Sequence, residues 1–319
     1  MSTESRSDSR ATGIWYALAA FIAWGVLPLY WKALYQVAAG EILAHRIIWS
    51  FIFVAAMLIS CGGWSSLREI MAKPSSRVSI FLGSLLISAN WFIYIWAVNA
   101  NHLVEASLGY YINPLFNIMI GVLVLRERLN FWQTIALILA FLGVMVITLQ
   151  HGKIPWIALS LAITFGLYGL VKKLNKVESL SGLALETLFV VPLALGYLFL
   201  QHLGGHGSFA SLSWKVTLLL MGSGIATALP LLWFTKGAKR VPLSTIGFLQ
   251  YLGPTISLLI GVMVFKESFT RVHLFSFSLI WCALLLYSFS KTNFLCQMQP
   301  KYFKNNQYYK GISKALLNK

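Results

Sequence analysis

The sequence predicts an all-α membrane protein whose ten transmembrane helices form two inverted five-helix repeats. Three observations lead to this fold class: the apolar composition, the length and number of the apolar segments, and a stretch that recurs after 140 residues. The 319-residue chain is 58% hydrophobic and only 11% charged, whereas soluble proteins are about 25% charged. A soluble domain of this composition could not cover its surface with polar residues, so we expect the chain to lie in a lipid bilayer.

The apolar segments have the length of membrane spans. A helix that crosses the hydrocarbon core needs about 20 apolar residues, and short connections between such segments predict antiparallel neighbours. The ten expected spans are residues 13–34, 41–61, 77–98, 103–125, 131–150, 154–174, 181–202, 213–236, 242–265 and 270–290. A polar N-terminal segment, 1–12, precedes them, and a basic tail, 292–319, follows them. The first span is too long for the apolar core of a cleavable signal peptide.

One stretch of the chain aligns with a later stretch without a gap. Residues 111–129 match residues 251–269 at seven of 19 positions, and the identical positions include a proline, a glycine and a glutamate. Apolar matches arise by chance in such a chain, but these three do not. A period of about half the chain indicates an internal duplication, and we place the two repeats at 13–150 and 151–291.

The basic residues predict the orientation of the chain. With the N-terminus in the cytoplasm, 19 of the 25 Lys and Arg residues fall on the cytoplasmic side and five on the opposite side, while Arg46 lies inside a span. This bias follows the positive-inside rule, and ten spans return the C-terminus to the cytoplasm. Because each repeat has an odd number of spans, the second must be inverted relative to the first. Inverted repeats are typical of secondary transporters, in which one half rocks against the other.

Two prolines at equivalent positions, Pro114 and Pro254, fall about halfway along the fourth and ninth expected spans. Each should kink its helix and free the carbonyl four residues earlier, that of Tyr110 or Gln250. In lipid such a carbonyl needs another partner or a water-lined cavity. We interpret the kinks as lining a substrate cavity; the alternative is a packing kink whose carbonyl bonds to a neighbouring helix. Further polar residues that flank the kinks are Tyr111, Asn113, Asn117 and Tyr251.

Ionisable residues inside spans are costly and usually face a cavity or a partner. Arg46, next to His45, and Glu105 both lie near the outer ends of their spans. An ion pair between Arg46 and Glu105 would neutralise both charges. The pair would serve as an outer gate, as a substrate contact, or as a static tether between two helices.

Glu186 is the third ionisable residue within a span, at the position equivalent to His45 or Arg46. It is a candidate carrier of a coupling proton, because burial favours the protonated form of a carboxyl group. Alternatively, it pairs with Lys173 or Lys236 at the inner end of the sixth or eighth span.

The third expected span carries a polar and aromatic face. Asn90 and Tyr94 are four residues apart and share one side of a helix, and the same span holds Trp91 and Asn99. Such a face suits an amphipathic, partly aromatic solute, although interfacial belts also gather Trp and Tyr. Trp233 in the eighth span is a weaker counterpart.

The sequence carries no motif of an enzyme. It lacks HExxH, GxSxG, a P-loop and a glycine-rich dinucleotide loop, so we expect no catalytic residues and a transport process that runs on a gradient. The three cysteines and six histidines are scattered without metal-ligand spacing, and we expect neither a metal nor another cofactor. The net charge of +16 belongs to loops and tail rather than to a nucleic-acid interface.

Three stretches resemble a known family: GEILAHRIIWS (40–50), SANWFIYIWAVNANHLVEASLGYYINPL (88–115) and STIGFLQYLGPT (244–255). They look like the RarD branch, the chloramphenicol-sensitivity proteins, of the EamA-type drug/metabolite transporter superfamily. The resemblance covers residues 13–291, but the basic tail is not part of it. It implies a multi-pass carrier in the bacterial inner membrane with both termini cytoplasmic. The substrate stays open, because the name suggests drug handling while related carriers export amino acids and other metabolites.

We therefore expect a secondary active exporter of a small organic solute, such as a drug or metabolite, coupled to protons. Its site would lie near mid-membrane, lined by the third, fourth, eighth and ninth spans. One alternative is an importer or exchanger of anionic metabolites, for which the spans offer Arg46 and Lys32 as cations. Another is a non-transporting membrane scaffold, which would not need inverted symmetry. The expected partners are the solute and the lipid bilayer, and the oligomeric state stays open.

Overall fold

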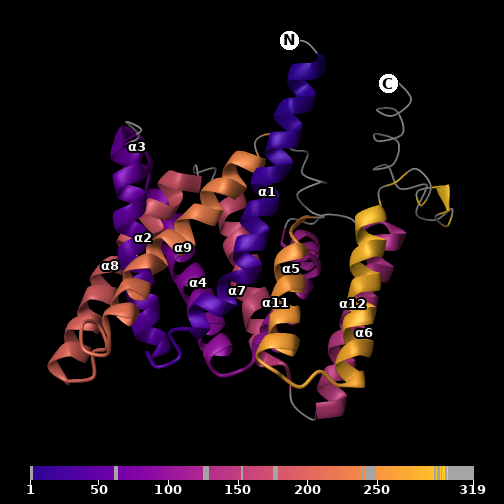
Figure 1. Ribbon diagram of the computed structural model, residues 1–319. Coiled ribbons are helices and arrows are strands. Elements are labelled where there is room, and N and C mark those ends of the chain that lie inside the picture. The colour runs from indigo at the N-terminus through magenta and orange to yellow at the C-terminus, as the bar shows by residue number, and fades with distance from the viewer. Residues whose placement is uncertain are drawn as a thin grey trace. The chain divides into compact units, whose positions relative to one another are not determined.

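The computed structural model describes residues 3–60, 64–124, 129–151, 154–174, 179–238, 240 and 249–290, together with 292, 295, 297, 298 and 300. The side chains of residues 1–10 and 61–66 and of Asn117 lie outside the described part, as does Glu127 of the repeated stretch. Most of the expected basic tail 292–319 also lies outside it. Every regular element within the described residues is a helix (Figure 1), which confirms the expected all-α class.

The helices follow the expected apolar segments closely. Their bounds are α1 Thr3–Lys32, α2 Ala39–Ser60, α3 Trp64–Ala72, α4 Pro74–Asn99, α5 Leu103–Leu123, α6 Phe131–His151, α7 Trp156–Leu174, α8 Ser179–Leu203, α9 Trp214–Ala238, α11 Leu252–Leu259, the π-helical η1 Ile260–Val264, and α12 Arg271–Phe289. Within the described residues, seven helices are long and apolar enough to cross a membrane: α1, α2, α4, α6, α8, α9 and α12. Residues 156–172 and 252–264 form shorter apolar helices.

The sequence period extends to the positions at which helices begin. Helices α2 and α8 begin at residues 39 and 179, α4 and α9 at 74 and 214, and α6 and α12 at 131 and 271. The members of each pair are thus 140 residues apart, the same offset that aligns the repeated stretch. The duplication therefore reaches well beyond the stretch in which identical residues reveal it.

Two elements differ from the sequence expectation. Helix α3 was not expected; its apolar Leu67, Ile70 and Met71 recur at helical spacing and pack against α4 and α8. In the ninth expected span, α11 begins at Leu252, so Pro254 lies in its first turn rather than halfway along a helix. Proline is tolerated there, because the N–H that it lacks has no partner within the helix. Residue 249 is helical and residues 250 and 251 form a turn, so the described residues show an interruption of the helix just before Pro254, whereas Pro114 lies inside α5.

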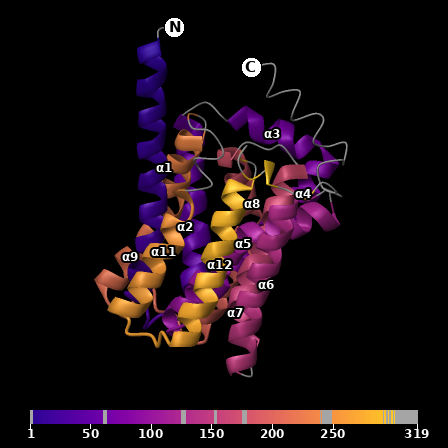
Figure 2. The ribbon, with the colours of Figure 1, turned by 90° about the vertical axis from the view of Figure 1, so that its right-hand side faces the viewer.

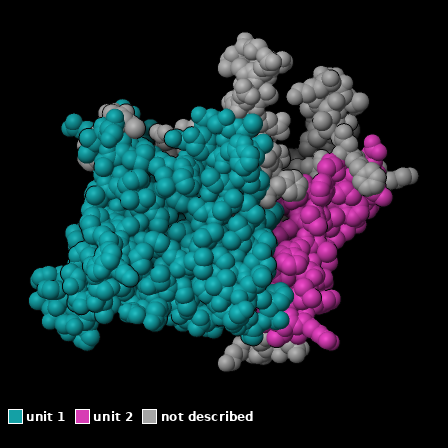
Figure 3. All heavy atoms as spheres, viewed as in Figure 1, with its two compact units in different colours: residues 1–113, 156–269 teal, residues 114–155, 270–319 magenta. Residues whose placement is uncertain are grey.

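The chain divides into two compact units, coloured in Figure 3. Unit 1 comprises residues 1–113 and 156–269, and unit 2 comprises residues 114–155 and 270–319. Each unit contains parts of both sequence halves. In unit 2, α6 and α12 lie side by side (Figures 1 and 2), and the hydroxyl of Ser276 donates a hydrogen bond of 2.6 Å to the Gly143 carbonyl.

Helices of unit 1 meet at close range. Helix α1 packs on α9 and α11, α2 on α8 and α9, and α4 on α7 and α8. At the crossing of α2 and α9, a Cβ atom added to Gly224 would lie 2.3 Å from the carbonyl carbon of Trp49. Only a glycine permits this approach. Small residues at such crossings are typical of membrane helices, whose association depends on van der Waals packing.

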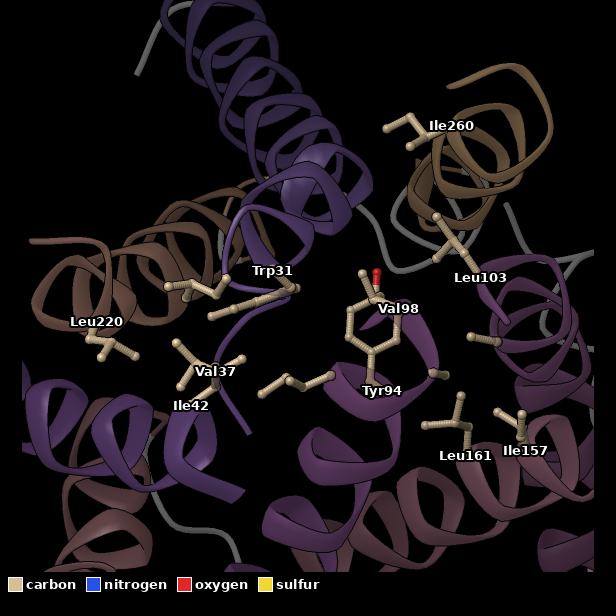
Figure 4. Close-up of a cluster of buried hydrophobic side chains, with 14 of the residues drawn as sticks. Trp31, Val37, Ile42, Tyr94, Val98, Leu103, Ile157, Leu161, Leu220 and Ile260 are labelled. Carbon is tan, nitrogen blue, oxygen red and sulfur yellow. The ribbon is translucent and has the colours of Figure 1, made fainter. Parts of the chain in front are cut away.

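The interior of unit 1 contains a cluster of buried apolar side chains (Figure 4). Trp31 of α1, Ile42 of α2, Tyr94 and Val98 of α4, and Leu161 of α7 belong to it. Many large apolar side chains also lie on the outside, among them Leu193, Leu195, Phe199 and Leu200 on α8. Apolar residues on both the inside and the outside are expected of helices that are surrounded by lipid.

Candidate functional site

A buried arginine lies between two aromatic rings. Arg46, on α2, is 6% exposed. Its guanidinium carbon is 4.1 Å from the ring centre of Trp91 on α4 and 4.9 Å from that of Trp31 on α1. A guanidinium at these distances is attracted by the negative faces of the rings. Three helices thus meet around one positive charge.

The expected ion pair between Arg46 and Glu105 is wrong. Oε1 of Glu105 instead accepts a hydrogen bond of 3.0 Å from the backbone N–H of Ile157, at the start of α7. The first N–H groups of a helix lack partners within the helix and carry partial positive charge, so they attract a carboxylate. Glu267 acts in the same way at the start of α5, where it accepts from the N–H groups of Leu103 and Val104 at 2.8 and 2.7 Å.

Several polar atoms of unit 1 are enclosed without a hydrogen bond. Nε of Arg46 and Nε1 of Trp31 have no hydrogen-bond partner among the described residues. The same is true of the side-chain oxygens of Asn99 and Asn113 and of Nε2 of His45. A buried donor without a partner costs about 1–3 kcal/mol, and such groups are few in native proteins.

The polar face of α4 contacts α5 and α7. Asn90 donates hydrogen bonds to the Leu161 carbonyl at 3.1 Å and to Oγ1 of Thr164 at 2.9 Å, both on α7. The hydroxyl of Tyr110 on α5 donates to Oδ1 of Asn90 at 3.4 Å. The rings of Tyr94 and Tyr110 meet edge to face, with centres 5.5 Å apart. Asn90 and Tyr94 do share one face, and Asn90 links α4 to α5 and α7.

Glu186, on α8, is a second buried charge, 3% exposed. Its Oε1 is 2.6 Å from Nζ of Lys172, and its Oε2 accepts a hydrogen bond of 3.0 Å from the Tyr168 hydroxyl. The partner is therefore Lys172 and not the expected Lys236, while the side chain of Lys173 lies outside the described residues. Tyr168 and Lys172 are one turn apart on α7, and both contact Glu186 of α8.

The two buried charges occupy equivalent places in the two sequence repeats. Arg46 and Glu186 are 140 residues apart, and Trp31 and Lys172 are 141 apart. In the first repeat an aromatic ring on α1 faces an arginine on α2. In the second repeat a lysine on α7 faces a glutamate on α8. The same pair of helix positions thus holds a cation without a carboxylate in one repeat and a closed ion pair in the other.

Equivalent tyrosines meet in the interior. The rings of Tyr111 and Tyr251, which are 140 residues apart, stack with centres separated by 6.4 Å and planes inclined by 13°. The Tyr111 hydroxyl also shares a hydrogen bond with Oγ1 of Thr255. These residues join α5 to the start of α11.

The other expected residues lie elsewhere. His45 stacks on Phe209, with ring centres 4.7 Å apart. Beside it, Oε1 of Glu41 accepts hydrogen bonds from the backbone N–H groups of Ser208 and Phe209 at 2.7 and 3.1 Å, which ties this loop to α2. Three residues are half-buried, and no described hydrogen bond or ion pair joins them to Arg46 or Glu186: Trp233, Gln250 and Pro254.

Sequence reasoning missed Trp31, Tyr168, Lys172 and Glu41. Tyr168 and Lys172 had a usable signal, because an i, i+4 pair of polar residues within an apolar helix indicates a partner on a neighbouring helix. Trp31 had none, since Trp is common in such a chain. Among the described residues no group of three or more His, Cys, Asp or Glu side chains is placed to hold a metal ion.

Proteins similar to this chain include several that are named as transporters. Residues 11–149 and 153–289 each match the EamA-like transporter family. The chain is 51% identical over 284 residues to the uncharacterized transporter YojE of Bacillus subtilis (strain 168), an alignment that covers 88% of this chain and 94% of YojE. It is 42% identical over 282 residues to protein RarD of Escherichia coli (strain K12), with 88% and 95% covered. A crystal structure that is 17% identical covers 89% of this chain and 99% of its own, with a TM-score of 0.58, a likeness of fold alone.

Proposed function

The chain belongs to the EamA-like transporter family and is a multi-pass membrane transporter, and we propose that it exports a small organic solute across the bacterial inner membrane. The cargo would be a drug or metabolite, moved by a gradient of solute or protons. Transport would proceed by alternating access between two inverted repeats of five spans, residues 13–150 and 151–291. The distribution of basic residues favours a cytoplasmic location for both termini.

The observation that carries this proposal is the equivalence of the helix contacts between the two sequence halves. In unit 1, α1 contacts α9, and the equivalent pair, α7 with α4, is also in contact. Helices α2 and α8, equivalents of each other, pack together, and the equivalent Tyr111 and Tyr251 stack. A two-fold relation between repeats produces this exchange of partners. Five spans in each repeat would make the relation an inverted one.

The Arg46 cluster is our candidate for the cargo site. Arg46 and its two tryptophans belong to α1, α2 and α4, all in the first repeat. Helix α4 also packs on α7 and α8 of the second repeat. A rocking movement between the repeats would therefore change the surroundings of Trp91 and Arg46, as alternating access requires.

Glu186 is our candidate for proton coupling. As a carboxylate it forms the ion pair with Lys172 that joins α8 to α7. A proton bound to Glu186 removes the negative charge and with it the ion pair. Protonation from one side of the membrane and release to the other would link the α7–α8 contact to the direction of transport.

Two measurements test the proposed function. A comparison of metabolites inside and outside cells with and without the gene identifies the cargo. Inside-out vesicles that contain the chain should then accumulate this cargo, and an acidic vesicle interior should increase the accumulation. Equal accumulation without the chain would contradict transport, and equal accumulation without the gradient would contradict proton coupling. In Glu186→Gln, we expect transport to lose its pH dependence; unchanged dependence removes Glu186 from the coupling.

An importer or exchanger of anionic metabolites is the second candidate. It is favoured by one observation, that Arg46 has no carboxylate partner among the described residues. Right-side-out vesicles distinguish the two candidates, because an importer accumulates its cargo there and an exporter does not.

A further inference from the structure

The positive charge of Arg46 has no described carboxylate partner. This feature indicates the chemical class of the cargo. Among the described residues, the buried charged side chains are Glu41, Arg46 and Glu186. Glu41 is occupied by two backbone N–H groups and Glu186 by Lys172. Within the described part of the chain, Arg46 contacts two aromatic rings, has no carboxylate partner, and its Nε makes no hydrogen bond. A buried cation is strongly destabilised unless an anion or hydrogen-bond acceptors balance it.

The guanidinium offers two terminal amino groups as donors. Nε of Arg46 is enclosed without a partner and the whole residue is 6% exposed, so we expect a solute to bind the terminal amino groups. Nε1 of Trp31 is a second enclosed donor without a partner, and its ring centre is 4.9 Å from the guanidinium carbon. Two sets of N–H donors in one cluster fit an oxyanion, since a guanidinium binds the paired oxygens of a carboxylate or phosphate.

We propose that the Arg46 cluster binds the single oxyanion group, carboxylate or phosphate, of an organic cargo whose apolar or aromatic body lies against the surrounding rings. The inference rests on the proposed function and names its substrate class. The terminal amino groups of Arg46 hold the oxyanion, and Nε1 of Trp31 supplies a further donor. The guanidinium carbon lies over the rings of Trp31 and Trp91, whose attraction holds the charge in place.

A single anionic group follows from the contacts of two half-buried lysines, Lys32 and Lys172. Lys32 donates hydrogen bonds to the Val98 and Asn99 carbonyls at 3.2 and 3.1 Å and to Oδ1 of Asn101 at 2.8 Å. Lys172 is paired with Glu186. Neither is available for a second anionic group, so a dianionic metabolite would leave a charge unbalanced.

The depth of Arg46 favours a cargo over a lipid headgroup. Arg46 is the eighth residue of α2, a helix of 22 residues. At about 1.5 Å per residue it lies roughly 10 Å along the axis from the start of the helix. Headgroup phosphates lie outside the hydrocarbon core, which is about 30 Å thick. A solute that enters the bundle reaches this depth more readily than a headgroup does.

The test uses the purified full chain in nanodiscs of phosphatidylcholine, with calorimetric titration of three matched probes: phenylacetate, phenylphosphonate and the neutral phenylacetamide. We expect saturable binding of at least one anion and binding of the amide at least about tenfold weaker, the effect of one lost charge-assisted hydrogen bond. Wild-type protein that binds neither anion, or that binds the amide as tightly, overturns the proposal.

Variants assign the binding to the proposed groups. Arg46→Gln should remove the preference for anions, and Arg46→Lys should retain part of it, which also shows that the site still folds. Trp31→Phe keeps an aromatic ring but removes the N–H, and should weaken anion binding severalfold. Lys215→Gln, which removes an exposed lysine at the start of α9, is the matched control and should bind as wild type does. If Arg46→Gln keeps the preference for anions, the proposal is wrong. If Trp31→Phe binds anions as tightly as wild type does, Nε1 of Trp31 is not a second donor.

Two further arms separate the remaining outcomes. If phosphatidylglycerol in the nanodisc competes with the probes, the oxyanion is that of a lipid, and the cargo assignment is wrong. If a neutral cargo identified from cells crosses vesicles normally in Arg46→Gln, the proposed function stands and this inference fails. If anions bind through Arg46 but no solute crosses vesicles under any gradient, the binding site stands and the proposed function fails.

Discussion

The close approach of α2 and α9 at Gly224 makes a sharp prediction about stability. In Gly224→Ala, the new Cβ would lie 2.3 and 2.4 Å from the carbonyl carbon and oxygen of Trp49 and 2.7 Å from the backbone nitrogen of Ser50. These are backbone atoms of α2, which cannot rotate away as a side chain can. An ordinary contact begins at 3.4 Å, so the two helices must separate by about 1 Å, which forfeits roughly a quarter to a half of each dispersion contact along the crossing.

We expect Gly224→Ala to destabilise the chain by about 3 kcal/mol, the upper end of the range for overpacked interiors. This corresponds to a factor of more than about 100 in the unfolding equilibrium. The measurement is reversible unfolding of the purified chain in mixed micelles. The matched control is Gly196→Ala on α8, where a Cβ would meet nothing within 4 Å; it should change stability by about 1 kcal/mol or less. Equal stability of the two variants would refute the reasoning, because it would mean that α2 and α9 do not approach at Gly224.

Two further predictions concern buried carboxylates. Lys172→Met should destabilise the chain by about 3–5 kcal/mol, because Glu186 is left buried without its cation. The double variant with Glu186→Gln should recover most of this loss in the same unfolding assay, and a double variant as unstable as the single one would contradict the ion pair. Glu267→Gln should speed hydrogen exchange at the amides of Leu103 and Val104 by about tenfold or more, because both lose a charge-assisted bond. Exchange at wild-type rates would show that the contact with α5 is absent in solution.

The sequence predicted those parts of the fold that follow the 140-residue period. The 140-residue offset that aligns Tyr111 with Tyr251 also separates the starts of α2 and α8, of α4 and α9, and of α6 and α12. The sequence did not predict a helix boundary that depends on the residues nearby. Pro254 looks equivalent to Pro114, but the helix around Pro254 begins only at Leu252, so the same residue type lies in a first turn instead of an interior.

The sequence predicted only part of the candidate site. The partner of a buried charged residue depends on how the neighbouring helix is rotated about its axis as well as on the sequence of that helix. Arg46 and Glu186 stood out as charges within apolar segments, and both are buried. Their partners were not predictable: a shift of one residue along α7 separates Lys172, which faces Glu186, from Lys173. For Glu105, the free N–H groups at the start of α7 compete with any arginine, and helix ends of this kind are not visible in a list of charged residues.

The equivalence of Arg46 and Glu186 has a consequence for how such a protein can be assembled. Two separate copies of one repeat, associated as a homodimer, would have to carry the same side chain at both places, and so would bury either two cations or two carboxylates. In a single chain that contains both repeats, the two equivalent positions can hold different residues. Such a chain can keep an open positive charge in one half and a neutralised acid in the other, so covalent linkage of the repeats permits an electrical polarity that a symmetric dimer of identical halves excludes.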